Sequence, residues 1–156
     1  MNSEHPSLQG RIILVTGAGQ GLGRATALAC ARAGATVVLL GKTTAKLEKV
    51  YDEIVAAGGP MPAIFPMNLD DAADKDFDTM AQAIAGQLTR LDGIVHCAAA
   101  FEPPAPLAIQ SVAAWQEQMQ VNCIAPFAIN KACERLLRSS PDASVILIGE
   151  SHGHAP

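Results

Sequence analysis

The sequence has 156 residues, of which 49% are hydrophobic and 17% charged, and its formal net charge is −4 at pH 7. This length suits one folded domain with a sizeable buried core, and the high apolar content excludes a disordered chain. The acidic balance, with no cluster of Lys and Arg, argues against nucleic acid as a main partner.

Residues 1–10 are polar and contain Pro6, so we expect a flexible tail there and no signal peptide. No apolar run approaches the roughly 18 residues that a membrane-spanning helix needs. The four cysteines are far apart and form no CxxC pair, so we expect buried free thiols in a reducing compartment. These features favour a cytoplasmic protein that does not insert into a membrane.

Five short apolar segments alternate along the chain with segments of helical period. The expected strands are residues 11–16, 36–40, 63–67, 93–98 and 143–149. Their continuous runs of Val, Ile and Leu are typical of parallel strands that helices cover on both faces.

Four helices are expected between these strands. They span residues 21–34, 44–58, 71–90 and 111–138. Pro126 lies inside the last one, and we expect a kink near it because proline has no N–H to donate. The alternation of strand and helix predicts a single α/β domain over residues 1–156, with a doubly wound parallel sheet of the Rossmann type.

The stretch 16-TGAGQGLGR-24 directly follows the first expected strand and opens the first expected helix. Gly17 and Gly21 allow the backbone to turn tightly and approach a ligand, and Gly23 allows the helix to pack on the strand. The N–H groups at the start of such a helix suit a pyrophosphate. A tight turn without a ligand is the alternative, but the strand–turn–helix context favours a dinucleotide site.

The Gly-x3-Gly-x-Gly spacing of this turn resembles that of the short-chain dehydrogenase/reductase family, and further segments agree with the family in order along nearly the whole chain. Asn68-Leu69 is similar to the family's Asp-apolar pair at the adenine, and 92-DGIVHCAAA-100 is similar to its Asn-Asn-Ala-Gly segment along the cofactor. Val121-Asn122 resembles the helical Asn that helps hold a proton-relay water, and residues 144–149 resemble the strand that leads to the catalytic Ser.

The resemblance implies an oxidoreductase that binds a dinucleotide and transfers a hydride to or from a carbonyl or alcohol of a small-molecule substrate. It also implies catalytic roles for Asn122 and Ser151. The residues expected to contact the cofactor are Gly17, Gln20, Gly21, Leu22, Gly23, Lys42, Asn68, Leu69, Ala98 and Ala99.

The end of the second expected strand bears on the choice of cofactor. An acidic residue there would bond the ribose 2′-OH of NAD and repel the 2′-phosphate of NADP. The sequence instead reads 39-LLGKTT-44, where Lys42 would attract a 2′-phosphate and Thr43 or Thr44 could donate to it. NADP(H) is therefore expected in preference to NAD(H), the alternative being that Lys42 is only a solvated loop residue.

Several positions depart from the family pattern. Cys97 and Ala99 stand where the family usually has Asn and Gly, and Cys97 is interpreted as a small buried residue in preference to a reactive thiol. His96, in the same strand, is interpreted as a hydrogen-bonded core residue. In 149-GESHG-153, Glu150 takes the place of the catalytic Ser, and Ser151 follows one residue late.

The family's Tyr-x3-Lys pair, which supplies the acid proton, is missing, because the only tyrosine is Tyr51. The family chain continues for roughly another hundred residues, so we expect a fold truncated after the fifth strand. A non-catalytic dinucleotide-binding or interaction module is the alternative function. His152 and His154 are interpreted as solvated loop residues in preference to metal ligands, and no metal site is expected.

The helix expected at residues 111–138 carries Trp115 and Met119 one turn apart. In the family this helix packs against its copy in a second subunit, so the resemblance implies a homo-oligomer through residues 111–138. Burial of the two side chains in the chain's own core is the alternative, because an exposed apolar helix face requires some cover.

Overall fold

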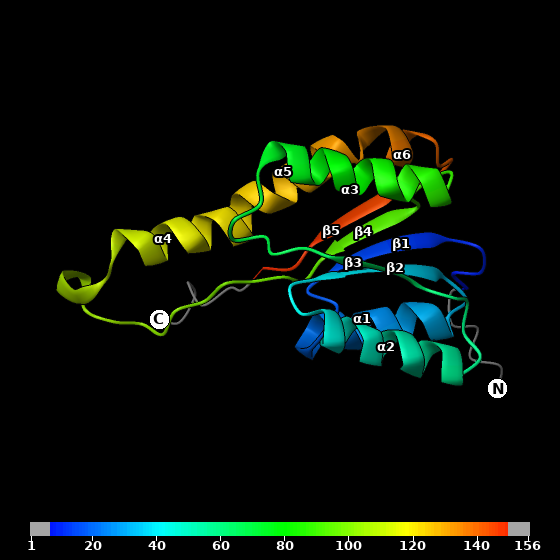
Figure 1. Ribbon diagram of the computed structural model, residues 1–156, viewed down its shortest axis with the longest axis horizontal. Helices are drawn as coiled ribbons and strands as arrows, with labels where there is room; N and C mark the ends of the chain where they lie inside the picture. Colours follow the sequence, from blue (N-terminus) through cyan, green and yellow to red (C-terminus); the bar gives the residue numbers. More distant parts are fainter. Residues whose placement is uncertain (1–6, 150–156) are drawn as a thin grey trace, which may run out of the picture.

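The computed structural model describes residues 7–149, which form a five-stranded parallel sheet between two layers of helices (Figure 1). The strand order is β3-β2-β1-β4-β5, so the doubly wound sheet expected from the sequence is confirmed. The strands are β1 (Ile12–Thr16), β2 (Thr36–Gly41), β3 (Ala63–Pro66), β4 (Gly93–His96) and β5 (Ser144–Leu147).

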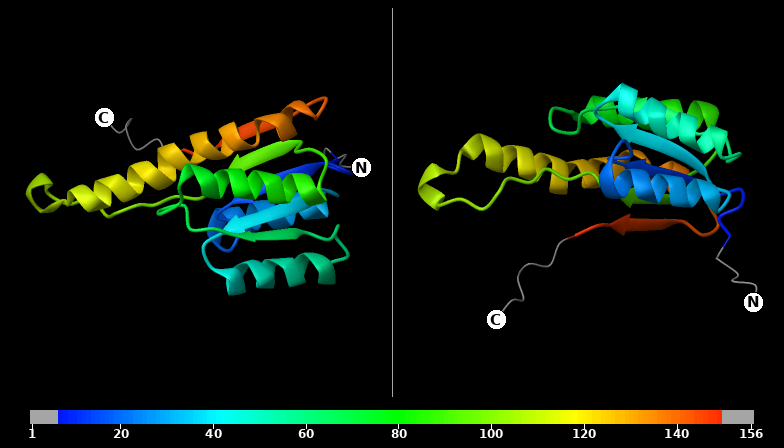
Figure 2. Two further views of the ribbon diagram at one scale, coloured as in Figure 1. Left: turned by 45° about the horizontal axis from the view of Figure 1, so that its top comes forward. Right: turned by 90° about the horizontal axis from the view of Figure 1, so that it is seen from below.

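The helices lie on both sides of this sheet. Their bounds are α1 (Gly21–Arg32), α2 (Thr44–Ala56), α3 (Asp74–Gln87), η1 (Leu107–Ile109), α4 (Val112–Met119), η2 (Gln120–Ile124), α5 (Ala125–Ala132) and α6 (Glu134–Arg138). Helices α1 and α2 cover one face, and α3, α5 and α6 cover the other (Figures 1 and 2). Within residues 7–149, no helix combines the length and the apolar character that crossing a membrane requires.

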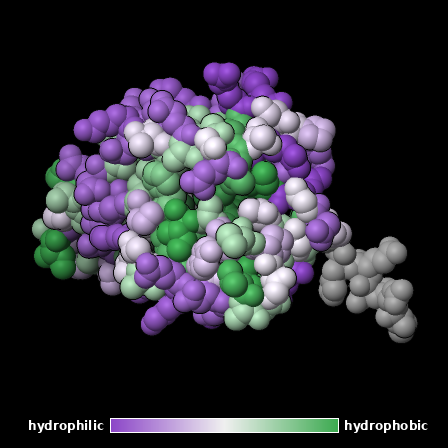
Figure 3. Space-filling view, turned by 45° about the vertical axis from the view of Figure 1, so that its right-hand side comes forward, coloured by the Kyte–Doolittle hydropathy of each residue, from purple (hydrophilic) through white to green (hydrophobic). Residues whose placement is uncertain are grey.

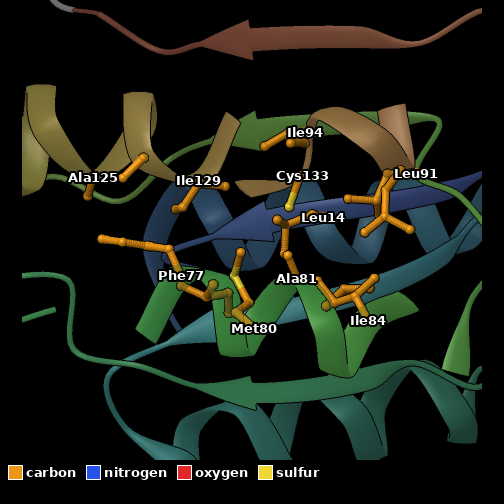
Figure 4. Close-up of a cluster of buried hydrophobic side chains, with 14 of the residues drawn as sticks. Leu14, Phe77, Met80, Ala81, Ile84, Leu91, Ile94, Ala125, Ile129 and Cys133 are labelled. Carbon is orange, nitrogen blue, oxygen red and sulfur yellow. The ribbon is translucent and has the colours of Figure 1, made fainter. Parts of the chain in front are cut away.

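Alternate residues of the central strands point into two separate cores, as the geometry of a strand requires. Leu14 of β1 packs against α3 and α5, whereas its neighbours Ile13 and Val15 pack against α1 and α2. Figure 4 shows the first core, in which Phe77 and Met80 of α3 lie opposite Ile129 of α5, with Leu14 of β1 beside them. Aliphatic side chains predominate in both cores, which explains the continuous apolar runs in the sequence.

The sequence predicts one long helix over residues 111–138, and this is wrong in detail. A π-helical turn, η2, separates α4 from α5, and a further break at Cys133 precedes α6. In η2 the N–H of Ala125 donates to the carbonyl of Gln120, five residues earlier. The kink expected near Pro126 stays a prediction, but the π-helical turn ends two residues before Pro126, which cannot donate to the carbonyl of Asn122 four residues earlier.

Among residues 7–149, nothing covers helix α4 or strand β5, whereas the sequence analysis expects helices on both faces of the sheet. All four residues of β5 are exposed, and among the described residues β5 pairs only with β4. Helix α4 has no buried residue and points away from the sheet (Figure 1). The space-filling view shows apolar side chains between the polar ones on one face of the molecule (Figure 3).

The residues before β1 and the cysteines also differ from expectation. Within the expected flexible tail, the N–H groups of Leu8 and Gly10 donate to the carbonyls of Ala33 and Gly34. Only Cys133 is fully buried, which raises its pKa to about 12. The other three thiols are half-buried or exposed, and their residues are Cys30, Cys97 and Cys123.

Candidate functional site

The glycine turn joins β1 to α1 at the carboxyl end of the sheet. Gly17 and Gly21 have φ angles of +65° and +52°, in the left-handed region that favours glycine. A Cβ atom on Gly17 would lie 2.9 Å from the Cα of Ala98, and a Cβ on Gly23 would lie 2.2 Å from the carbonyl oxygen of Gly17. These two glycines therefore allow the turn to pack against β4 and the helix to pack against the turn.

Hydrogen bonds fix the turn to the neighbouring strands. The buried Thr16 hydroxyl accepts from the backbone N–H groups of Cys97 and Ala98, each at 3.1 Å. The N–H of Ala18 donates to the carbonyl of Leu40 at 3.0 Å. The ends of β1, β2 and β4 are thus held together around the turn.

A cleft of about 490 Å³ opens above this turn, at the carboxyl ends of the strands. All ten residues expected to contact the cofactor line it: Gly17, Gln20, Gly21, Leu22, Gly23, Lys42, Asn68, Leu69, Ala98 and Ala99. The tertiary structure brings together segments that follow four different strands. Their role as cofactor ligands remains a prediction.

The cleft is also lined by residues that the sequence analysis did not assign to it. They are Gly19, Leu40, Gly41, Lys46, Leu47, Met67, Asp70, Cys97, Ala100, Glu117 and Val121. Thr43, which the sequence analysis expects as a possible donor to a 2′-phosphate, lines the cleft as well. Most of the unassigned residues lie one or two positions from an assigned residue, so proximity in sequence could have suggested them. Lys46 and Glu117 are different, because only the packing of α2 and α4 brings them to the cleft.

The start of α1 has the features of an anion site. Its N-cap residue is Gln20, whose side chain makes no capping hydrogen bond, and no acidic residue lies in the first turn. A Cβ built on Gly21 would have no heavy atom within 4 Å, so the space above that residue is open. Free N–H groups facing open space at a helix start fit the pyrophosphate of a dinucleotide.

Cys97 lies on the cleft wall and is half-buried. Burial raises the pKa of its thiol, and a hydrogen bond with Thr26, at 3.9 Å between Sγ and Oγ1, offsets only part of that rise. A thiol with a raised pKa carries little thiolate and is a poor nucleophile. The geometry therefore favours the interpretation of Cys97 as a small packing residue.

Asn122 lies in η2 and holds the segment that follows β4. Its Oδ1 accepts from the N–H of Ala100 at 2.8 Å, and its Nδ2 donates to the carbonyl of the same residue at 2.7 Å. Ala100 lines the cleft, so Asn122 positions the cleft wall. The other residue given a catalytic role, Ser151, lies outside the described residues, as do Glu150, His152 and His154.

His96 is a buried core residue, as the sequence analysis expects. Its Nε2 lies 2.9 Å from Oδ1 of Asn130, and its Nδ1 has no partner among the described residues. Burial lowers the pKa of His96, and the contact with Asn130 raises it by a smaller amount. Tyr51 is a residue of α2 that packs against the core beneath α1 and α2, and it does not line the cleft.

Comparison with known proteins agrees with this geometry. The family model described as short chain dehydrogenase matches residues 11–156. The uncharacterized oxidoreductase YciK of Escherichia coli K12 is 39% identical over 146 residues, which are 94% of this chain and 58% of that protein.

Two solved structures were obtained with a cofactor. A chain from Shigella flexneri 2a strain 301, complexed with NADP, is 38% identical, with a TM-score of 0.85 over 88% of this chain and 57% of that one. A chain from Escherichia coli CFT073, complexed with NADPH, is 40% identical, with the same TM-score and coverage. The present chain thus spans less than two thirds of the length of these relatives.

Proposed function

The chain belongs to the short chain dehydrogenase family, and on this premise we propose that the protein is an oxidoreductase that binds NADP(H) and acts on a carbonyl or alcohol. The observation that carries the proposal is the cleft at the carboxyl ends of the strands, where the open start of α1 meets residues that follow β2, β3 and β4. Ligands in doubly wound folds bind at this edge of the sheet.

Each group in the cleft has a distinct proposed task. The first-turn N–H groups of α1 hold the pyrophosphate, and the apolar side chain of Leu69 with Asn68 holds the adenine. The backbone of Ala98 and Ala99 lies along the cofactor, and Asn122 keeps the adjoining Ala100 in place. When bound, the nicotinamide ring supplies or accepts the hydride.

We propose NADP(H) in preference to NAD(H) because the cleft has a basic end. Lys42 and Thr43 both line the cleft beyond β2, whereas Thr44 begins α2 and is not part of the lining. The two similar chains that were solved with NADP and NADPH support this choice. Titration of the full-length protein with NADPH and with NADH, followed by calorimetry, tests it. Equal affinity for the two, or tighter binding of NADH, would refute the preference.

A dinucleotide-binding module without catalysis is the second candidate function. It is favoured by one observation, that Tyr51 does not line the cleft, so this tyrosine cannot supply an acid proton there. A turnover assay on a broad panel of alcohols and carbonyls separates the two candidates. Tight NADPH binding without turnover on any substrate would support the module.

We also propose that the protein forms a homo-oligomer and resides in the cytoplasm. Trp115 and Met119 are 56% and 46% exposed in the part of the chain that the structure describes, which supports a contact outside that part. We propose that they contribute to a homo-oligomer through residues 111–138, which sedimentation analysis of the full-length protein would detect. Free cysteines support a reducing compartment such as the cytoplasm.

A further inference from the structure

We propose that Lys46 is a specificity-determining residue, which together with Lys42 selects a cofactor that carries a 2′-phosphate. The inference rests on the proposed function, since it assigns one more residue to the proposed NADP(H) cleft. Lys46 lies in the first turn of α2 and lines the cleft together with Lys42 and Thr43. It is not part of the glycine turn or of the segment that ends β2.

The glycine turn holds Lys46 over the cleft. A Cβ atom on Gly19 would lie 3.0 Å from the Cβ of Lys46, so the lysine stem lies directly on a residue that has no side chain. At its other end, Nζ of Lys46 donates a hydrogen bond to Oε1 of Gln20. The exposed side chain is thus directed back across the turn toward the start of α1.

The partner of Lys46 leaves its charge uncompensated. Gln20 is a neutral acceptor, and an ammonium group has three N–H donors, so two remain for a ligand. Elsewhere on the same pair of helices, Arg24 of α1 forms an ion pair of 2.5 Å with Glu53 of α2. Among residues 7–149, neither Lys42 nor Lys46 has such an ion pair. Away from the cleft, the basic side chain between α1 and α2 is therefore neutralised by a carboxylate. At the cleft, the positive charge of Lys46 has no such partner among the described residues.

The charge of this pair of lysines matches a phosphate monoester. Such a group carries about −1.5 to −2 charges near neutral pH, whereas the 2′-hydroxyl of NAD carries none. Two uncompensated ammonium groups at one end of the cleft therefore favour the phosphorylated cofactor. The N–H groups of α1 are assigned to the pyrophosphate, which both cofactors share, so the proposed role of Lys46 concerns the 2′ group in which the two cofactors differ.

The test compares Lys46→Met with Lys49→Met in the full-length protein. Lys49 lies one turn further along α2, is exposed and does not line the cleft, so its variant makes the same change in net charge without touching the site. Calorimetry measures the Kd of each variant for NADPH, NADH, 2′,5′-ADP and 5′-AMP. Thermal melting establishes that each variant folds, and Lys46→Gln replaces Lys46→Met if the latter does not.

Lys46→Met is expected to weaken NADPH and 2′,5′-ADP binding by about tenfold, the effect of losing one charged hydrogen bond, and to change the Kd for NADH and 5′-AMP by less than about twofold. Lys46→Arg is expected to retain most of the affinity, and Lys49→Met all of it. If Lys46→Met leaves the Kd for NADPH unchanged, or weakens NADH binding as much as NADPH binding, the specificity role of Lys46 is wrong. The proposed function is not affected by that outcome. If the wild-type protein binds neither NADPH nor NADH, both the proposed function and the role of Lys46 are wrong.

Discussion

The side-chain amide of Asn122 pairs with both backbone groups of Ala100, at 2.8 Å and 2.7 Å. A π-helical turn and the segment that follows β4 are thereby joined through one side chain, although 22 residues separate Asn122 from Ala100 in sequence. An amide is suited to this contact because it is both donor and acceptor, as a peptide group requires. The contact holds one wall of the cleft in the position that the proposed cofactor needs.

We expect Asn122→Ala to lower the free energy of unfolding by about 1–2 kcal/mol, since it removes two partly solvated hydrogen bonds. It should also weaken NADPH binding, because the segment after β4 loses its support. Urea unfolding and calorimetry measure the two effects. Gln118→Ala is the control, because the Gln118 amide contacts only the carbonyl of Ala114 in its own helix. Similar cofactor affinity in both variants would contradict the positioning role.

Substitution of Gly21 by alanine should impair cofactor binding more than folding. Its φ of +52° makes any side chain strained, at a cost of about 1–2 kcal/mol, and the added methyl group would project into the cleft. The control is Gly58→Ala, because Gly58 has a φ of +75° and equally open surroundings but lies outside the cleft. Both variants should lose similar stability, and only Gly21→Ala should lose roughly tenfold or more in NADPH affinity. Equal affinities would place the pyrophosphate elsewhere.

Lys42→Glu should reverse the cofactor preference. A carboxylate beyond β2 would repel a 2′-phosphate and accept a hydrogen bond from a ribose 2′-OH. We expect NADPH affinity to fall by roughly ten- to a hundredfold while NADH affinity holds or improves. The ratio of the two dissociation constants, measured at low and at high salt, is the readout. If that ratio stays at the wild-type value, Lys42 is a solvated residue.

Asp92 lies at the end of the sheet opposite the cleft, and it should make the free energy of unfolding depend on pH. Its buried carboxylate accepts from Ser140 Oγ at 2.7 Å, Arg90 Nε at 2.8 Å and the N–H of Ile12 at 2.9 Å. Burial alone would raise the pKa of Asp92, but these hydrogen bonds outweigh it and hold the pKa below its usual range.

A lowered folded-state pKa means that the unfolded chain binds the proton first as pH falls. The contribution of Asp92 is therefore complete above the unfolded-state value of about 3.9 and is lost as pH falls through the folded-state pKa. We expect Asp92→Asn to cost about 2–4 kcal/mol near neutral pH, because Arg90 loses a buried partner. Urea unfolding should show that the difference in free energy of unfolding between the wild type and Asp92→Asn becomes smaller as the pH falls below the unfolded-state pKa. A difference that does not change with pH would contradict the assignment.

Much of the fold could be predicted because its signals are local. The apolar runs of β1, β2 and β4 and the helical period of α1, α2 and α3 each depend on residues within one element. The glycine turn was also evident, because positive φ angles and close packing against a strand restrict positions 17 and 23 to glycine. Each predicted boundary lies within a few residues of the observed one, except along residues 111–138.

The sequence by itself determined the order of strands and helices, the glycine turn and the segments that follow each strand, because these follow from short-range sterics and periodicity. Only the tertiary structure decided that Lys46 reaches Gln20, that Asn122 pairs with Ala100, and that α4 and β5 remain uncovered. Those contacts join elements whose separation in space depends on how helices pack on the sheet. No local pattern records that packing, so the shape and charge of the cleft emerge only once the chain has folded.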